Sequence, residues 1–207
     1  MPTPTPTRRT RRTRRPPEAR ADEIVQTARR LFATRGFRGT TVAAVAADVG
    51  ITDAGLLHHF PTKNALLKAV LDHHTQVGAD QIRAILAPQG LDGIRGLAAW
   101  GEVMESQPHL LGFEIALSSE AIEPASDLHE FFTARYTVLR RWLMRTFQQG
   151  VDAGEIRPDV DPAHETSCFV ALLDGLRLQW FFADGGVPIA DRVRTYVDQL
   201  VARIEVP

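Results

Sequence analysis

The spacing of apolar residues constrains the fold of this 207-residue chain more than any other feature. From residue 18 onward, apolar side chains recur every three or four positions, which places them on one face of successive helices. The strict alternation typical of a half-buried strand persists nowhere. The sequence therefore predicts an all-α fold.

The region from residue 18 to 61 has the pattern of three short helices. The first would run from Glu18 to Thr34 and end before Gly36. The second would begin at Thr40 or Thr41 and end at Gly50, and the third would lie between a capping Thr52 and Pro61. Short helices with a tight turn at the second glycine are typical of a helix-turn-helix.

A longer apolar pattern follows, from Thr62 to about Ala87, and would join the two halves of the chain. Glycine and proline clusters then predict breaks near residues 90–93, 107–112, 122–125, 150–161 and 185–188. Asp161 followed by Pro162 is a strong helix start, and the helix that it opens is apolar on more than one face. We expect that helix to pack on its own core and on a partner subunit.

Charge is distributed very unevenly. Residues 1–70 hold 13 Lys and Arg against 5 Asp and Glu, a net charge of +8, whereas residues 71–207 hold 11 against 20, a net of −9. Six arginines lie between residues 8 and 15, after a Pro/Thr alternation that cannot bury apolar area. We interpret residues 1–17 as a disordered basic arm, which either binds nucleic acid or is a solvated tail.

Other features limit the class of protein. No run of about 18 apolar residues predicts a membrane span, and the single cysteine, Cys168, predicts a reduced, packed thiol. We therefore expect a cytoplasmic protein. A phosphate-binding glycine loop, a nucleophile elbow and a His-Glu-x-x-His motif are all missing from the sequence, and the adjacent His73 and His74 cannot share one helix face as a metal pair would. We expect no enzyme activity, no cofactor and no metal.

Two runs resemble the DNA-binding domain of the tetracycline-repressor (TetR) family: residues 36–41, Gly-Phe-Arg-Gly-Thr-Thr, and residues 59–63, His-Phe-Pro-Thr-Lys. Between and after them, Val45-Ala46, Gly50-Ile51-Thr52, Leu56 and Leu66-Leu67 also match, so the resemblance covers about residues 20–70. It implies a helix-turn-helix domain at residues 18–70, followed at 71–207 by a helical domain for ligand binding and dimerisation. It also implies a homodimer that represses transcription until a small ligand binds.

The resemblance assigns roles to residues of the helix-turn-helix. Thr41, His59 and Lys63 match positions that contact phosphate, although His59 is equally compatible with a solvated histidine. The positions that match base-edge contacts, starting from the beginning of the third helix, are Thr52, Asp53, Gly55 and His58.

The recognition surface departs from the family pattern in ways that remove polar contacts. Leu57 stands where tyrosine is usual, and Gly55 where a longer side chain is usual, although Leu57 could contact a thymine methyl. We expect the basic arm to compensate by reaching the minor groove of operator DNA. Its candidate contact residues are Arg11, Arg12, Arg14 and Arg15.

The helical half holds candidates for a ligand pocket. The apolar lining would come from Trp100, Met104, Phe113, Leu117, Phe132, Tyr136, Phe169, Leu172 and Trp180, with Arg135, Arg140 and Gln179 as possible polar anchors. Aromatic residues at this spacing are more often plain core than cavity lining.

This lining favours a largely apolar small molecule. The function predicted is a repressor that such a ligand releases from a palindromic operator. The alternative is a DNA-binding dimer without a small-molecule ligand, architectural or controlled by a protein partner. Dimerisation is expected through the helix opened at Pro162 and the last helix, with its stripe of Val193, Val197, Leu200 and Val201.

Overall fold

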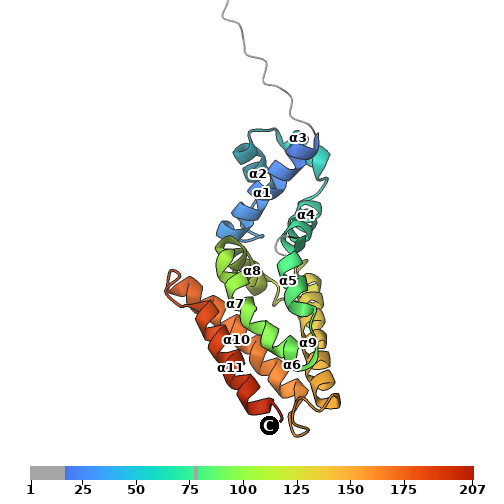
Figure 1. Cartoon of the computed structure of the whole chain (residues 1–207). Coiled ribbons are helices and arrows are strands. Elements are labelled where there is room, and N and C mark those ends of the chain that lie inside the picture. Colours follow the sequence, from blue (N-terminus) through green and yellow to red (C-terminus); the bar gives the residue numbers. More distant parts are fainter. Residues whose placement is uncertain (1–16, 77–78) are drawn as a thin grey trace, which may run out of the picture.

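The computed structural model describes residues 17–76 and 79–207, and within them it contains helices and one isolated bridge between Ile156 and Glu205 but no strand. The prediction of an all-α fold is confirmed. Figure 1 shows an elongated molecule with α1–α3 at one end and the C-terminus at the other.

The N-terminal end consists of α1 (Pro17–Arg35), α2 (Val42–Val49) and α3 (Asp53–His59). As predicted, threonines cap α2 and α3: the hydroxyl of Thr41 accepts from the N–H of Ala44, and that of Thr52 from the N–H of Gly55, both at 3.1 Å. Gly50, with φ of +74°, ends α2 in the left-handed conformation that glycine adopts without steric cost.

Two helices lead away from this end, α4 (Lys63–Gln76) and α5 (Ala79–Leu86). They flank residues 77–78, which lie outside the described part. They correspond to the pattern predicted from Thr62 to Ala87, and the Thr62 hydroxyl caps α4 by accepting from the N–H of Ala65 at 2.9 Å. Next come α6 (Gly90–Gly96), the 3-10 helix η1 (Leu97–Ala99), α7 (Trp100–Ser106) and α8 (Pro108–Glu120).

The break expected at residues 90–93 is wrong, because α6 begins at Gly90. Its first turn is stabilised by a residue far along the chain: the carboxylate of Glu155 accepts from the N–H of Leu91 at 2.9 Å. A tertiary contact thus outweighs the poor helix propensity of glycine.

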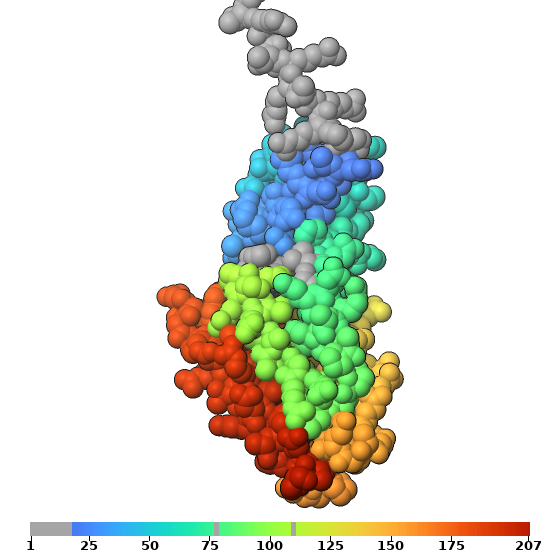
Figure 2. Space-filling view, viewed as in Figure 1, coloured from blue at the N-terminus to red at the C-terminus, as the bar shows by residue number. Residues whose placement is uncertain are grey.

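Three long helices complete the chain, α9 (His129–Asp152), α10 (Pro162–Phe182) and α11 (Ile189–Ile204). The predicted start of α10 is confirmed, since the Asp161 carboxylate accepts from the N–H of Ala163 at 2.9 Å. Buried Glu165 of α10 forms a two-bond ion pair with Arg203 of α11, at 2.8 Å for each bond. In Figure 2, α5–α7 (green) lie between α11 (red) and α9 (gold) on the visible face.

Apolar side chains form two cores. The first core joins α1–α4 to the second half of the chain, because Phe113 and Leu117 of α8 and Phe132 of α9 belong to it. The second core is formed mainly by α5–α7 and α9–α11. The N-terminal end, α1–α4, is therefore not packed independently of the rest.

The last helix differs from expectation in its packing. Val193, Val197 and Leu200 are at most 2% exposed and belong to the second core of their own chain, so they are not free to contact a partner. Helix α11 uses that stripe to complete its own subunit. Among the exposed apolar side chains, three gather near the end of α10: Leu178 and Phe182, which also line the cavity described below, and Phe181.

Candidate functional site: a helix-turn-helix and a cavity

The helix-turn-helix comprises α2, the residues Gly50-Ile51-Thr52 and α3. Leu56 is fully buried, and Ile51 and Phe60 are partly buried against the same core, so α3 is held by its apolar side. An ion pair between Arg30 of α1 and Asp48 of α2 joins these two helices at the surface. The opposite side of α3 is left open to solvent.

The residues proposed to contact DNA lie on this open side or beside it. Thr41, Thr52, Asp53, Leu57 and His58 are exposed. Both threonine hydroxyls already accept a hydrogen bond from the backbone, but each keeps its own proton and can still donate to a phosphate oxygen.

The other predicted DNA contacts are more restricted. Gly55 and His59 are half-buried, and the Lys63 ammonium lies 4.2 Å from the centre of the Phe37 ring. Burial lowers the pKa of Lys63. The arm residues Arg11, Arg12, Arg14 and Arg15 lie outside the described residues.

Helix α8 is attached directly to the DNA-binding end. The carboxylate of Glu120 accepts from the N–H of Phe37 at 2.8 Å and from the N–H of Arg38 at 3.1 Å. Beyond the end of α8, Glu123 pairs with the guanidinium of Arg38. These contacts connect α8 to the loop that leads into α2.

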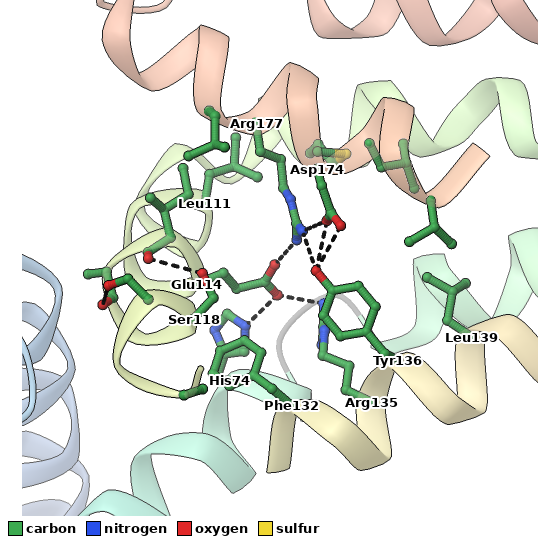
Figure 3. A pocket seen from close by; sticks show the side chains of 18 of the residues that line it. His74, Leu111, Glu114, Ser118, Phe132, Arg135, Tyr136, Leu139, Asp174 and Arg177 are labelled. Carbon is green, nitrogen blue, oxygen red and sulfur yellow. Dashed lines mark hydrogen bonds and ion pairs between the residues drawn. The ribbon is translucent and has the colours of Figure 1, made fainter. Parts of the chain in front are cut away.

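A cavity of about 940 Å³ lies in the helical half, with walls from α4, α5 and α7–α10. Figure 3 shows side chains from α4, α8, α9 and α10 converging on it. Its apolar walls include Trp100, Met104, Leu111, Ile115 and Phe132. Ligand pockets in proteins commonly have volumes of roughly 300–1,000 Å³, so the cavity is large enough for a small organic molecule.

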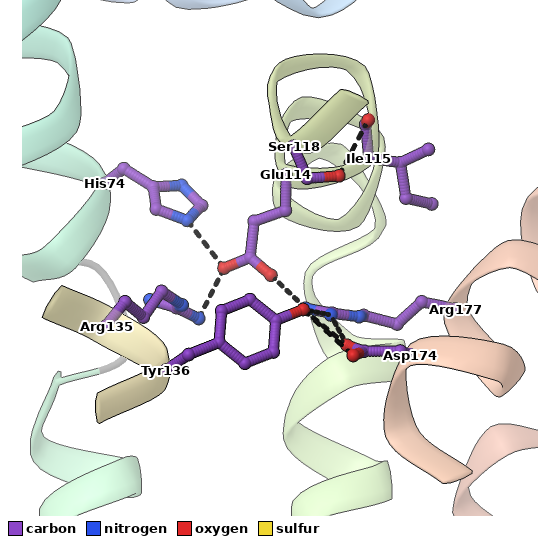
Figure 4. A network of polar contacts seen from close by, with 8 residues as sticks. All are labelled: His74, Glu114, Ile115, Ser118, Arg135, Tyr136, Asp174 and Arg177. Carbon is purple, nitrogen blue, oxygen red and sulfur yellow. Dashed lines mark hydrogen bonds and ion pairs between the residues drawn. The ribbon is translucent and has the colours of Figure 1, made fainter. Parts of the chain in front are cut away.

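One wall of the cavity carries a network of charged side chains (Figure 4). The carboxylate of Glu114 on α8 bonds to His74 of α4 at 2.9 Å, to Arg135 of α9 at 2.5 Å and to Arg177 of α10 at 2.5 Å. A second carboxylate, Asp174, pairs with Arg177 and accepts from the Tyr136 hydroxyl at 2.9 Å. The network connects α4, α8, α9 and α10.

Burial and charge oppose each other at Glu114. Burial raises the pKa of this carboxyl, but the hydrogen bond from His74 and the charges of Arg135 and Arg177 outweigh it and lower the pKa to about 2. Burial alone would lower the pKa of Arg177, but Glu114 and Asp174 raise it overall. The burial of Tyr136 raises the pKa of its phenol. Glu114 and Arg177 are therefore both ionised at neutral pH.

The cavity wall includes some of the predicted ligand residues. Trp100, Met104, Phe132 and Tyr136 line it, as do Arg135 and Arg140 among the possible polar anchors. The others lie away from it: Phe113 and Leu117 are buried in the first core, Phe169 is buried in the second, Leu172 and Trp180 pack against the second, and Gln179 is exposed. Apolar spacing alone does not separate a cavity wall from solid core.

Sequence reasoning missed four members of the polar network: His74, Glu114, Asp174 and Arg177. The signal available was a charged residue within an apolar helical run, as in Phe113-Glu114-Ile115 and Leu176-Arg177-Leu178. Charged residues at such positions are buried only when they are paired, and the pairing partners lie 40 and 63 residues away.

Two negative findings concern the described residues only. Among their helices, none has the length and apolar character needed to cross a membrane. The same part of the chain has no group of three or more His, Cys, Asp or Glu side chains placed to hold a metal ion.

Two family models match the sequence. The model described as "Bacterial regulatory proteins, tetR family" matches residues 24–70, which contain α2 and α3. The model described as "BetI-type transcriptional repressor, C-terminal" matches residues 108–205, which run from α8 to α11.

Individual proteins agree with these matches. The chain is 31% identical over 150 residues to the HTH-type transcriptional repressor KstR2 of Mycolicibacterium smegmatis, covering 70% of this chain and 71% of that protein. In fold it is similar to a transcriptional regulator from Saccharomonospora viridis, solved in complex with choline, with a TM-score of 0.72 and 22% identity over 92% of this chain and 99% of the other. The ketosteroid transcriptional regulator KstR2 of Mycobacterium tuberculosis has a TM-score of 0.69 at 22% identity, covering 91% of this chain and 96% of its own.

Proposed function

The chain belongs to the tetR family of bacterial regulatory proteins, and we propose that it is a homodimeric repressor that a small molecule releases from a palindromic operator. Family membership makes it a DNA-binding transcriptional regulator and not an enzyme. The proposal adds the operator symmetry, the dimer, the direction of control and the effector.

The observation that carries the proposal is the cavity of about 940 Å³ beside a buried ionic network. Paired charges in the interior are costly to maintain, so their place in the wall of a ligand-sized cavity favours a binding role over a purely structural one. A fully packed core would have favoured the alternative, a DNA-binding dimer without a ligand. The mainly apolar lining supports a largely apolar effector.

The packing of α8 supports a connection between the cavity and the DNA-binding end. Glu114 of this helix lies at the cavity, while Glu120, less than two turns further on, holds the backbone of Phe37 and Arg38. His74 connects the same network to α4, which directly follows the helix-turn-helix. A ligand that displaces Glu114 would therefore act on both attachments of the DNA-binding end.

A two-fold dimer is supported by the exposed apolar side chains near the end of α10, which are costly to leave in water. In such a dimer, two copies of α3 would enter successive major grooves about 34–36 Å apart, so the operator would be an inverted repeat.

The proposal is tested with a duplex selected from random DNA by the full-length protein. The selected sites should be inverted repeats, and a screen of small molecules against the complex should yield compounds that release the DNA. Thr137→Trp, at an exposed position on the cavity wall, should abolish release by those compounds. The matched control is Val138→Trp, which adds the same side chain one residue later, outside the cavity lining. Selection of short, non-repeated sites, or release that is unaffected by Thr137→Trp, would contradict the proposal.

A further inference from the structure

We infer that the effector is an amphipathic anion whose head group binds to Arg140, with its apolar body along α7 and α8; this inference rests on the proposed function. The argument depends on the balance of charge in the cavity wall, on the position of Arg140 and on the distribution of polar and apolar side chains around the cavity.

The charges of the network largely cancel. Glu114 neutralises Arg135 and shares Arg177 with Asp174, so two carboxylates face two guanidiniums. The oxygens of both carboxylates already accept hydrogen bonds from Arg, His or Tyr side chains. The network therefore offers a cationic ligand no free carboxylate, and such a ligand would have to break an existing ion pair to bind there.

Arg140 is the charge that remains. It lines the cavity, and its one side-chain partner among the described residues is the hydroxyl of Ser167, at 3.2 Å. That hydroxyl is neutral, and no ion pair within residues 17–76 and 79–207 includes Arg140. The cavity wall, with three arginines and two carboxylates, consequently has a surplus of one positive charge.

The geometry of α9 places this charge beside further donors. Arg140 lies one helical turn after Tyr136, and Thr133 and Thr137 of the same helix also line the cavity. A guanidinium presents its N–H groups in a planar fork that fits a carboxylate or phosphate with two parallel hydrogen bonds. This side of the cavity therefore fits an anionic head group.

Two other helices of the wall fit an apolar body. Trp100, Val103 and Met104 of α7 and Leu111 and Ile115 of α8 line the cavity. A ligand that is apolar along its length, with a single anionic end, satisfies both kinds of lining. This refines the effector class from largely apolar to amphipathic and anionic.

The test uses probes that share one tail and differ in the head group: dodecanoate, dodecyl phosphate, dodecan-1-ol and dodecyltrimethylammonium, each below its micelle concentration. Binding to the full-length protein is measured by calorimetry, and release of the selected operator duplex is measured in parallel. At least one of the two anions should bind about 10- to 100-fold more tightly than the alcohol, since a charge-assisted hydrogen bond is lost without it. Comparison of the two anions identifies whether the site takes a carboxylate or a phosphate.

Substitution then locates the head group. Arg140→Gln should remove the preference for the anion over the alcohol and leave binding of the alcohol unchanged. Arg141→Gln is the matched control, because Arg141 is exposed and is not part of the cavity lining. Equal binding of all head groups, tighter binding of the ammonium probe, or a preference that survives Arg140→Gln would overturn the inference.

The parallel release measurement separates this inference from the proposed function. An anion that binds through Arg140 without releasing DNA supports the head-group assignment and contradicts ligand-controlled repression. If the alcohol releases the DNA as effectively as the anions do, the result supports ligand-controlled repression and contradicts the head-group assignment.

Discussion

The carboxylate of Glu120 accepts a hydrogen bond from the backbone N–H of Phe37 at 2.8 Å, across 83 residues of sequence. Its second oxygen accepts from the N–H of the next residue, Arg38. A side chain of α8 thereby satisfies two backbone donors between α1 and α2, in the way that a capping residue does within its own helix.

Glu120→Ala should loosen this loop. Losing the acceptor leaves a largely buried N–H without a partner, which costs about 1–3 kcal/mol of unfolding free energy. Hydrogen exchange at Phe37 and Arg38 should also become faster. Glu123→Ala is the control, because Glu123 reaches only the exposed side chain of Arg38. Unchanged exchange at both amides in the Glu120 variant would exclude this role.

Glu114→Gln should reduce stability in a pH-dependent way. The folded-state pKa of Glu114 is about 2, below the usual value of 4.5, so the ionised carboxylate favours the folded state. That contribution is fully present above about pH 4.5 and is lost as the pH falls towards 2. At neutral pH the variant leaves Asp174 as the carboxylate paired with Arg177, and the lowered pKa of Glu114 corresponds to about 3 kcal/mol of lost stability.

Urea unfolding of the wild-type protein and the Glu114→Gln variant at pH 7, 4.5 and 3 measures this effect. The difference between them should be largest at pH 7 and smallest at pH 3. A difference that is constant over this range would mean that Glu114 is not the titrating group.

Leu57→Tyr should tighten operator binding. Leu57 is 40% exposed on the open side of α3, where a tyrosine hydroxyl could donate to a phosphate. One additional hydrogen bond to a charged phosphate oxygen corresponds to about a 10- to 100-fold gain in affinity. Leu57→Phe provides the ring without the hydroxyl, so its affinity should remain close to that of the wild type. Equal effects of the two variants would show that the ring, not the hydroxyl, changes binding.

Deletion of residues 1–16 should weaken DNA binding most at low salt. Each phosphate neutralised by Lys or Arg adds about 0.9 to the slope of log affinity against log salt, so losing several arginines should flatten the slope by several units. Lys63→Ala should change it by only about one unit per subunit. The deletion leaves all of α1 in place. If titrations at several salt concentrations give the same slope for both proteins, the arm is a solvated tail.

Phe181→Asp should weaken the dimer. Phe181 is 49% exposed near the end of α10, and a carboxylate introduced into an apolar interface is desolvated without a partner. Sedimentation equilibrium should show a wild-type dimer and at least a tenfold higher dissociation constant for the variant. Val138→Asp, on the exposed face of α9, should leave the dimer intact. A wild-type monomer at micromolar concentration would contradict the proposed assembly.

The elements that the sequence predicts correctly are those set by local chemistry. The caps at Thr41, Thr52, Thr62 and Asp161 follow from the affinity of a side-chain oxygen for a free N–H two or three residues later. The glycine that ends α2 follows from its left-handed conformation. Such signals lie within a few residues and require no knowledge of the fold.

The features that sequence reasoning misses depend on distant partners. The first turn of α6 forms where a break is expected because Glu155 reaches Leu91. The apolar stripe of α11 is equally compatible with a dimer surface and with core. Only the packing of the helices around it shows that Val193, Val197 and Leu200 belong to the core. The polar network in the cavity wall depends on four helices at once, so no local pattern identifies Glu114 as its centre.

The shared first core also has a consequence for protein engineering. Exchanging residues 71–207 for those of another family member would remove Phe113, Leu117 and Phe132 from the core that α1–α4 need. A chimaera built at that junction would leave the apolar faces of α1–α4 exposed to water unless the new half supplied equivalent side chains. A functional chimaera therefore has to retain α8 and the first turn of α9 with the N-terminal helices, or fill the same core positions from the new half.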